Sequence, residues 1–554
     1  MSRLKFLLSI AIIIAVTGIA FYPSLHNDFT NWDDDIYVIN NKDIRTISLK
    51  NLKEIFTSSY VSHYIPITIL SYAIEYHFFK LNPYAYHTIN FILHLLNCML
   101  VFWFIYIISG KEIVGFMVAL LFGIHPLHVE PVAWIAERKD VLYAFFYLSA
   151  LITYLYYLKK NNNWYYVLSI FCFILSLLSK AMAITLPFVL VLLDFILSRK
   201  FNRNVFTEKF PFLILAMLFG AIAIFILPSH QDTLHNIFHR IQYASYGLLF
   251  YSGKLMLPIN LSCLYPMDGI SSVLLLLSPF MLAILVGILI FFPVGRKKVI
   301  FGSLFFLISI APVLQLLPSG WAVAADRYIY IPSIGIFYFL SEGYYWLYES
   351  YKEKYKSMKI AFPFIFLVII TVLSYLTFNR CQVWKDSVTL WSDVIKNYPT
   401  IAMAYNNRGS AYLQKREVTK AIYDYSRALE INPDYLVAFD NLLRTYWAIG
   451  MKNEAQSLYK KATNTNPNYE AAYTNLGNVY WKIGKKDDAI ALYKMVIALN
   501  PNNAEAHEKL AWIHYYSGEY HLAFYHLTRA IELGHRVNDG LLKLLNPYRN
   551  NSKQ

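Results

Sequence analysis

The stretch FLLSIAIIIAVTGIAF, residues 6–21, is followed about ten residues later by NWDDDIYVIN, residues 31–40. The first stretch is an uninterrupted apolar run of the kind that crosses a bilayer as a helix. The second places three consecutive carboxylates, Asp33, Asp34 and Asp35, just outside it. Together they predict a membrane helix that ends in an acidic loop at the membrane surface.

The composition of the whole chain is that of an integral membrane protein. Of its 554 residues, 57% are hydrophobic, 17% aromatic and only 15% charged, and the mean hydropathy is +0.40. The net charge of +14 arises mainly in short basic connections between apolar segments, which is the pattern of the positive-inside rule. Nucleic-acid binding is therefore not expected. The four cysteines have no CxxC spacing and predict neither a disulfide framework nor a zinc site.

Apolar runs suited to span a bilayer recur over the first two thirds of the chain and predict eleven crossings. They lie near residues 5–22, 86–109, 112–124, 141–158, 164–179, 182–197, 210–228, 272–294, 299–317, 328–348 and 360–378. Two further apolar stretches, 64–80 and 241–257, carry ionisable residues and are interpreted as interfacial or re-entrant helices. The first run also resembles a signal peptide, but no clear small-x-small cleavage site follows it, so a retained span is preferred. With a cytoplasmic N-terminus, an odd number of crossings places the acidic loop and the C-terminal third together outside.

The C-terminal third repeats with a period of 34 residues, which is the signature of tetratricopeptide repeats. The repeating positions are Pro399, Pro433, Pro467 and Pro501; Gly450, Gly484 and Gly518; Ala421, Ala455, Ala489 and Ala523; and Ala404, Ala438, Ala472 and Ala506. Stacked repeats form a superhelix whose concave groove suits an extended peptide or a partner protein. The first-helix side chains expected in that groove are Tyr405, Asn406, Arg408, Tyr473 and Asn475.

The predicted fold class is therefore all-α. Residues 1–380 are predicted to form a polytopic membrane bundle, 381–540 a solenoid of about four repeats, and 541–554 a tail. The stretch DSVTLWSDVIKNYP, residues 386–399, is interpreted as the last helix of a partial opening repeat that follows the final span directly.

The three adjacent carboxylates have two interpretations. One is a solvated loop that stays on its side of the membrane. The other is acid/base chemistry, because repulsion among Asp33, Asp34 and Asp35 can raise the pKa of at least one of them. Such a carboxylate is suited to take a proton from an incoming hydroxyl.

A second polar cluster lies in the stretch HPLHVEPVAWIAERKD, which begins at His125. His125, His128 and Glu130 could ligate a metal, yet no third histidine or cysteine stands at a typical zinc spacing. An anion site is favoured, in which histidine, Arg138 and Lys139 gather around a phosphate. The alternative is a helix end capped by solvated charge.

Two further cations stand at predicted membrane boundaries. Arg327 in ADRYIYIP is suited to bidentate phosphate contact, and Lys180 in LLSKAMAITLP lies between two short spans on the same side. Snorkelling toward the membrane surface is the alternative for both side chains. Because the chain has neither a P-loop nor a GxGxxG motif, a sugar transferase with these residues would take its donor as a lipid phosphate.

In this order, the motifs resemble those of the transmembrane and tetratricopeptide-repeat-containing proteins, a branch of the GT-C membrane glycosyltransferases. The stretches that carry the resemblance are WDDDIYVINNKDI, HPLHVEPVAWIAERKDVL, SKAMAITLP, YSGKLMLPINLS, ADRYIYIPS and VWKDSVTLWSDVIKNYP, followed by the repeats. The resemblance implies inverting transfer of a mannose-like hexose from a polyprenyl-phosphate donor to Ser or Thr of proteins captured by the repeats. The short repeat array and the composition suggest a bacterial member, set in the inner membrane with its active site and repeats in the periplasm.

The resemblance also implies roles for individual residues. Asp33 would be the base that deprotonates the acceptor hydroxyl, Asp34 would position the acceptor or a water, and Asp35 could substitute in either role. The residues implied to hold the donor phosphate are His125, His128, Glu130, Arg138, Lys180 and Arg327. No cofactor is required, because a glycosyl phosphate is already a good leaving group, but a divalent metal is compatible with the family.

Three alternatives stay open at this point. The sugar could be transferred to a glycan or lipid, with the repeats recruiting assembly partners. The bundle could be a non-catalytic anchor for the repeats, although the clustering of carboxylates and cations on one side argues against that. A transporter would need ionisable residues at mid-membrane depth in several spans, and Asp194 is nearly the only one.

Overall fold

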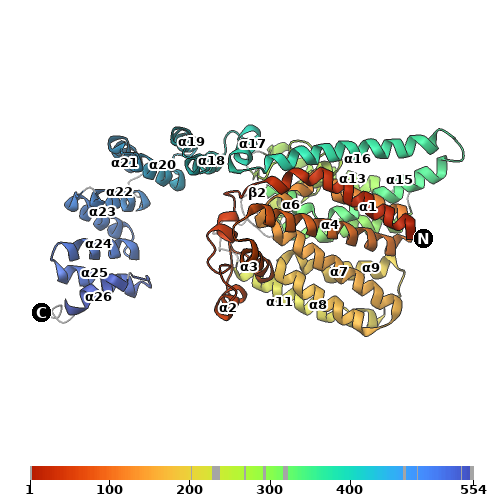
Figure 1. The fold of residues 1–554 in the computed structure, drawn as a ribbon, viewed down its shortest axis with the longest axis horizontal. Helices are drawn as coiled ribbons and strands as arrows, with labels where there is room; N and C mark the ends of the chain where they lie inside the picture. The colour runs from red at the N-terminus through yellow and green to blue at the C-terminus, as the bar shows by residue number, and fades with distance from the viewer. Residues whose placement is uncertain are drawn as a thin grey trace. The chain divides into compact units, whose positions relative to one another are not determined.

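A computed structural model describes residues 3–200, 202–226, 237–267, 270–290, 295–315, 322–465, 470–482, 484–537 and 539–548. Nearly all regular structure in these residues is helical (Figure 1), which confirms the all-α prediction. The chain divides into two compact units, Met1–Pro399 and Thr400–Gln554.

The first unit is a helical bundle. Its first nine α-helices are α1 (Arg3–Phe21), α2 (Leu49–Thr57), α3 (Pro66–Phe79), α4 (Pro83–Ser109), α5 (Glu112–Ile124), α6 (Val129–Ala133), α7 (Arg138–Lys160), α8 (Asn163–Ser179) and α9 (Leu186–Ile196). The later ones are α10 (Arg203–Thr207), α11 (Phe210–Ile226), α12 (Ile237–Met256), α13 (Ser272–Ile290), α14 (Arg296–Ile310), α15 (Ser333–Tyr351), α16 (Met358–Val383) and α17 (Ser387–Asn397).

Short helical turns and two strands connect these helices. The turns are η1 (Tyr22–His26), the π-helical η2 (Asp35–Ile39), η3 (Pro126–His128), η4 (Ile135–Glu137), η5 (Ala181–Thr185), η7 (Ala311–Val313) and η8 (Asp326–Ile329). The strands β1 (Tyr265–Pro266) and β2 (Ala322–Ala324) pair antiparallel. Several of these connections supply the polar residues described below.

Five helical segments among the described residues are long and apolar enough to cross a membrane. They are Leu4–His26, Pro83–Ser109, Ile135–Lys160, Val205–Ile226 and Met358–Val383. A sixth is formed if Glu112–Ile124 and Pro126–Ala133, which meet at a bend of 58°, make one span. The length and composition of these helices are those of a membrane protein. The count of eleven crossings stays a prediction.

The outside of the bundle is apolar. The side chains of Leu4, Phe225 and Ile360 are 78%, 91% and 76% exposed, and each lies on a helix that is long and apolar enough to cross a membrane. Inside, α7 packs along α8 (Figure 1), and α4 packs against both α5 and α7. This outward apolar surface is the arrangement that lipid favours and water does not.

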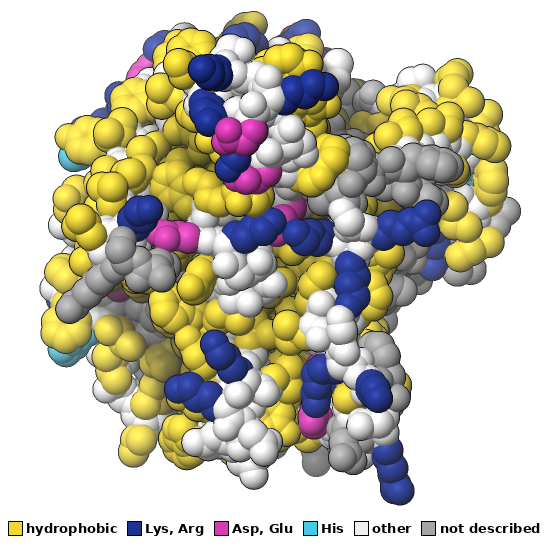
Figure 2. All heavy atoms as spheres, turned by 90° about the vertical axis from the view of Figure 1, so that its right-hand side faces the viewer, with side chains coloured by type: hydrophobic (Ala, Val, Ile, Leu, Met, Phe, Trp, Pro, Cys, Tyr) yellow, Lys and Arg dark blue, Asp and Glu magenta, His cyan; other side chains and the backbone are white. Residues whose placement is uncertain are grey.

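The basic connections meet at one end of the bundle, as the sequence predicts. Figure 2 shows lysine and arginine side chains spread over the end at which α1 begins, with fewer acidic ones. Lys111 and Lys298 both pair with Glu342, at 2.9 and 2.7 Å, and Lys297 contacts Ser198. These contacts bring together connections that are far apart in sequence.

The second unit consists of helical hairpins, which confirms the predicted repeats. Its helices are α18 (Ala402–Gln414), α19 (Val418–Ile431), α20 (Leu436–Ala448), α21 (Lys452–Thr465), α22 (Glu470–Lys482), α23 (Lys486–Leu499), α24 (Ala504–Tyr516), α25 (Tyr520–Glu532) and α26 (Asp539–Leu545). The repeated alanines, such as Ala421 and Ala455, are fully buried where paired helices approach each other. The repeated glycines lie in the left-handed region, with φ of +80° at Gly450.

Candidate functional site

The acidic loop between η1 and η2 is fixed by the junction of α16 and α17. The Asn27 side-chain amide donates to the Cys381 carbonyl at 3.1 Å, and the Asn31 backbone N–H donates to the Ser387 hydroxyl at 2.9 Å. The Trp391 indole donates to the Asn31 side-chain oxygen at 2.7 Å. The helix α17 therefore belongs to the first unit and holds the acidic loop in place.

Four tryptophans pack behind this loop. The ring centroids of Trp32 and Trp391 are 4.7 Å apart, and those of Trp32 and Trp134 are 6.1 Å apart. Trp384 stacks on Trp134 at 5.4 Å. Aromatic contacts of this kind add stabilisation beyond the burial of their area. They join the acidic loop to the connection that precedes α7.

Asp34 is a structural residue of this loop. One of its carboxylate oxygens accepts the backbone N–H of Ala136 at 2.8 Å, and the other accepts the backbone N–H and the hydroxyl of Thr30 at 2.8 and 3.0 Å. Burial raises the pKa of Asp34 to about 7 against the opposing effect of these hydrogen bonds. Because its oxygens are occupied by the protein, Asp34 is not free to position an acceptor, which is the role that the resemblance implies.

Asp33 is the carboxylate of the three that is available to a ligand. It is partly exposed, and neither of its side-chain oxygens accepts a hydrogen bond from any residue that the structure describes. Burial raises the pKa of Asp33 to about 6, while the positive charge of Lys139 and, more weakly, that of Arg327 oppose the rise. A carboxylate with this pKa is ionised at neutral pH and can accept a proton from a hydroxyl.

Asp35 lies at the start of the π-helical turn η2. Its side chain accepts the backbone N–H of Ile36 at 3.0 Å, and burial raises its pKa. This hydrogen bond joins Asp35 to the next residue of the turn, and the charge of Asp35 contributes to the raised pKa of Asp33. Asp35 is therefore a natural control residue for Asp33.

Three cations gather around Glu137 next to Asp33. The Glu137 carboxylate lies 3.0 Å from the Lys139 ammonium, 3.6 Å from the Lys180 ammonium and 3.3 Å from Nε of Arg327. Lys180 also contacts both carboxylate oxygens of Asp140 at 2.7 Å. Residues from η4, α7, η8 and the junction of α8 with η5 thus meet in one cluster, which we call the cation cluster: Glu137, Lys139, Asp140, Lys180 and Arg327.

The cation cluster is held in place by further contacts. The Arg327 guanidinium pairs with Glu130 at 2.5 Å, and its backbone N–H donates to the same carboxylate at 3.1 Å. The guanidinium also lies over the Trp134 ring, 5.5 Å from its centroid. The side chains of Arg327, Lys180 and Lys139 keep 18%, 11% and 5% of their surface exposed. Cations preorganised in this way and still accessible are suited to bind a phosphate.

The segment that carries Arg327 is anchored from a second side. The Tyr265 hydroxyl donates to Asp326 at 2.7 Å, and burial together with the charge of Glu130 raises the pKa of Asp326 to about 7. Arg380 pairs with Asp393 at 2.7 Å nearby and lowers the pKa of Asp326 in part. The first contact ties η8 to β1, and the second joins α16 to α17.

His63 lies near enough to the cation cluster to feel its charges, and the sequence analysis did not identify it. It lies in the loop between α2 and α3, where its backbone N–H and carbonyl each form a 2.8 Å hydrogen bond with Tyr60. The tight turn between them places Val61 and Ser62 at φ of 47° and 59°, a costly conformation for residues other than glycine. The surrounding protein and, after it, the charges of Lys139 and Lys180 lower the pKa of His63. No spacing or motif marks this histidine.

The structure does not bring His125 and His128 to the cation cluster. Both are almost fully buried. His125 bonds the Leu255 carbonyl at 3.1 Å, and His128 bonds the Phe122 carbonyl at 2.7 Å and the Ser333 hydroxyl at 3.2 Å. Buried polar rings take such partners because an unpaired one would be costly. Among the described residues, no three His, Cys, Asp or Glu side chains are arranged to hold a metal ion.

Arg138 also lies apart from the cluster, in contrast to the expectation from the sequence. Its guanidinium is fully buried and pairs with Glu75 of α3. It also donates to the Tyr86 carbonyl at 2.9 Å and contacts the Asn90 side chain. Because successive residues of a helix point about 100° apart, Lys139 faces the cluster while Arg138 faces α3 and α4.

The predicted groove residues of the first repeat are engaged within the second unit. Tyr405 and Asn406 are buried, and the Asn406 side-chain oxygen accepts the amide of Asn441 at 2.9 Å. Arg408 forms a bidentate pair with Asp424 at 2.7 and 2.8 Å. Two further predicted groove residues lie on α22 with side chains outside the described residues: Tyr473 and Asn475.

Comparison with known proteins identifies the repeats of the second unit. Tetratricopeptide-repeat family models match residues 402–435, 437–469 and 470–503. Among solved structures, the crystal structure of MamA is similar at 22% identity with a TM-score of 0.24, over 27% of this chain and 86% of that one.

Similarity to curated relatives extends over most of the chain. A protein O-mannosyl-transferase of Caenorhabditis elegans is 27% identical over 458 residues, 77% of this chain and 63% of that protein. The human protein O-mannosyl-transferases TMTC3 and TMTC1 are each 24% identical, over 81% and 78% of this chain and 54% and 56% of their own lengths. The resemblance predicted from the motifs is thereby confirmed, and the chain spans about half to two thirds of the length of these relatives.

Proposed function

We propose that this protein is a GT-C-type glycosyltransferase that moves a sugar, a mannose-like hexose, from a polyprenyl-phosphate donor to a hydroxyl group of a polypeptide. The observation that carries the proposal is the juxtaposition of Asp33, an unengaged carboxylate, with the cation cluster. A base beside an anion site is what a displacement at a sugar phosphate needs.

The cation cluster supplies the donor site in this proposal. Lys139, Lys180 and Arg327 face the phosphate diester of the donor, and Glu130, Glu137 and Asp140 hold the three cations in position without a bound ligand. Phosphate oxygens accept hydrogen bonds from ammonium and guanidinium groups, and preorganised donors stabilise the charge that develops on the leaving group.

The reaction then follows from the two halves of the site. The Asp33 carboxylate accepts the proton of the acceptor hydroxyl as the hydroxyl oxygen bonds to C1 of the sugar. The bond between C1 and the phosphate oxygen breaks, and its electron pair leaves on polyprenyl phosphate. One in-line displacement inverts the configuration at C1. A metal is not needed for this step, because the phosphate is already a good leaving group.

The second unit supplies the acceptor in this proposal. Superhelices of such repeats bind extended peptides, and the similar relatives are named protein O-mannosyl-transferases. The acceptor is therefore a Ser or Thr hydroxyl of a captured polypeptide. We place the protein in a bacterial inner membrane, with the basic end of the bundle cytoplasmic and the site outside.

The test compares Asp33→Asn with Asp35→Asn by intact-mass glycoproteomics of exported proteins, and with purified protein, radiolabelled polyprenyl-phosphate mannose and Ser/Thr peptides. Asp33→Asn should lower transfer by about 10²–10⁴-fold, the usual contribution of a general base, with donor binding retained. Asp35→Asn should stay near wild type. Normal turnover of Asp33→Asn would remove the base assignment, and transfer only to a glycan or lipid would redirect the acceptor.

A further inference from the structure

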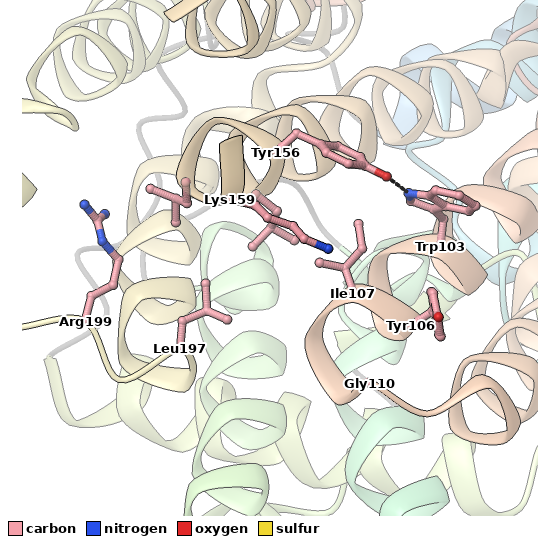
Figure 3. A pocket seen from close by; sticks show the side chains of 10 residues that line it. Trp103, Tyr106, Ile107, Gly110, Tyr156, Lys159, Leu197 and Arg199 are labelled. Atoms are coloured by element: carbon pink, nitrogen blue, oxygen red, sulfur yellow. Dashed lines mark hydrogen bonds between the residues drawn. The ribbon is translucent and has the colours of Figure 1, made fainter. Parts of the chain in front are cut away.

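A cavity lies at the other end of α7 from the cation cluster. Its volume is about 530 Å³, and it is enclosed by the last turns of α4 and α7 and by the connection after α9 (Figure 3). Because α7 runs from Arg138 to Lys160, its two ends are about 30 Å apart at 1.5 Å per residue. The cavity therefore belongs to the basic end of the bundle and is separate from the site described above.

Lys159 provides an available cation in this cavity. In Figure 3 its ammonium extends toward the middle of the space, and it has no hydrogen-bond or ion-pair partner among the residues that the structure describes. Its neighbour Lys160 is engaged instead with the Tyr165 hydroxyl at 3.1 Å. The Arg199 guanidinium points away from the cavity in Figure 3 and is neutralised by Asp194 at 2.8 Å and by Glu208 at 3.0 Å.

Two phenol groups add hydrogen-bond donors to the same space. The Trp103 indole donates to the Tyr156 hydroxyl at 3.1 Å, which leaves the hydroxyl proton of Tyr156 free to bond an acceptor (Figure 3). The Tyr106 hydroxyl has no partner among the described residues. None of the described lining residues carries a carboxylate. The polar groups of the cavity are thus one ammonium and hydroxyl donors, which is the complement of a phosphate.

The remaining walls of the cavity are apolar. They include Ile107, Leu155 and Leu197, and Leu197 is 39% exposed. Gly110 ends α4 in the left-handed conformation, with φ of +68°, and a Cβ placed there would meet no atom within 4 Å. Aromatic rings beside a lysine at the end of membrane helices are typical of the interfacial zone of a bilayer. A ligand here would meet both polar donors and apolar surface.

From these features we infer that the cavity binds the phosphate-containing head group of an anionic membrane phospholipid, with Lys159 as the charge partner and the phenols of Tyr106 and Tyr156 as hydrogen-bond donors. Basic pockets between membrane helices are suited to such head groups. The apolar walls receive the upper part of the lipid chains, which a free phosphate ion would not use. The basic end of the bundle, to which the cavity belongs, favours the same negative charge (Figure 2).

The test is native mass spectrometry of the full-length protein in detergent, with phosphatidylglycerol and phosphatidylcholine added in equal amounts. The wild type should retain phosphatidylglycerol over phosphatidylcholine. Lys159→Gln should weaken phosphatidylglycerol retention about fivefold, the factor expected for one lysine at an anionic surface, and Lys159→Arg should retain it. Lys160→Gln is the matched control, because that lysine is already engaged, and it should behave as wild type.

Several results would overturn this inference. Equal retention of the two lipids by the wild type, or equal retention of phosphatidylglycerol by the wild type and Lys159→Gln, would show that the cavity is not a lipid head-group site. Displacement of the lipid by millimolar inorganic phosphate would assign the cavity to a free anion. Thermal unfolding of each variant in the same detergent is the control that distinguishes a loss of lipid binding from a loss of the fold.

Discussion

Replacing Arg138 with methionine should destabilise the membrane bundle and leave donor binding by the remaining folded protein intact. The guanidinium is fully buried and pairs with Glu75, a side chain that is itself only 4% exposed. It also donates to the Tyr86 carbonyl at 2.9 Å and contacts Asn90. Methionine fills a similar space but leaves the Glu75 carboxylate buried without a counter-charge.

The size of the effect follows from that uncompensated charge. Breaking a buried ion pair on one side costs about 3–5 kcal/mol, mainly because the remaining charge stays desolvated. At about 2.1 cal/mol/K per residue, unfolding of the first unit, residues 1–399, has an entropy of about 0.8 kcal/mol/K, so such a loss lowers the apparent melting temperature by about 4–6 °C. Adding Glu75→Gln to Arg138→Met removes the stranded charge and should restore a large part of the lost stability.

The assay is thermal unfolding in detergent, followed by tryptophan fluorescence, together with donor binding per folded molecule. Lys139→Met is the matched control one residue further along α7, because its side chain faces the cation cluster. It should melt closer to the wild type than Arg138→Met does, because Glu137 keeps Lys180 and Arg327 as partners, and it should bind the donor about tenfold or more weakly. A wild-type melting temperature for Arg138→Met combined with weakened donor binding would refute the reasoning and return Arg138 to the phosphate site.

Three further outcomes are expected. Because burial raises the pKa of Asp33 to about 6 and the base must be ionised, kcat/KM should rise with pH up to about pH 7 and be about tenfold lower at pH 5; a flat profile would exclude this carboxylate. A Cβ at Gly302 of α14 would overlap the carbonyl oxygen of Gly335 of α15, so Gly302→Ala should cost about 1–3 kcal/mol in thermal unfolding, whereas Gly287→Ala, whose Cβ meets nothing, should not. Burial lowers the pKa of His526 to about 4, so between pH 4 and 6.5 the unfolded state binds more protons than the folded state. Hydrogen exchange in α24 and α25 should therefore show about 1–2 kcal/mol less stability at pH 5 than at pH 7.5. The substitution His526→Phe should remove this difference.

The sequence by itself determined the helical class, the membrane character of the first unit and the repeats of the second. These properties are local or periodic: a run such as residues 6–21 is apolar whatever it packs against, and alanines 34 residues apart mark one repeated hairpin. The resemblance to the family of the relatives followed from the order of motifs, which is also a property of the chain alone. The sequence likewise located the acidic residues from Asp33 to Asp35.

Tertiary structure alone decided which of these residues can act. Asp33 is open and Asp34 is not, because Thr30 and Ala136 occupy the oxygens of Asp34, and Ala136 is 102 positions away along the chain. The Trp391 indole reaches the loop through Asn31 across 360 positions. Hydrogen-bond partners this distant leave no trace in spacing or composition.

The same reason explains the cations. Spacing grouped Arg138 with the phosphate ligands, but the rotation of one residue along α7 sends Arg138 to Glu75 and Lys139 to the cluster. His63 lies near the charges of the cluster, on a turn between α2 and α3 that Tyr60 closes. Helical periodicity indicates that Arg138 and Lys139 lie on different faces of α7, and the packing of the bundle decides which face borders the site.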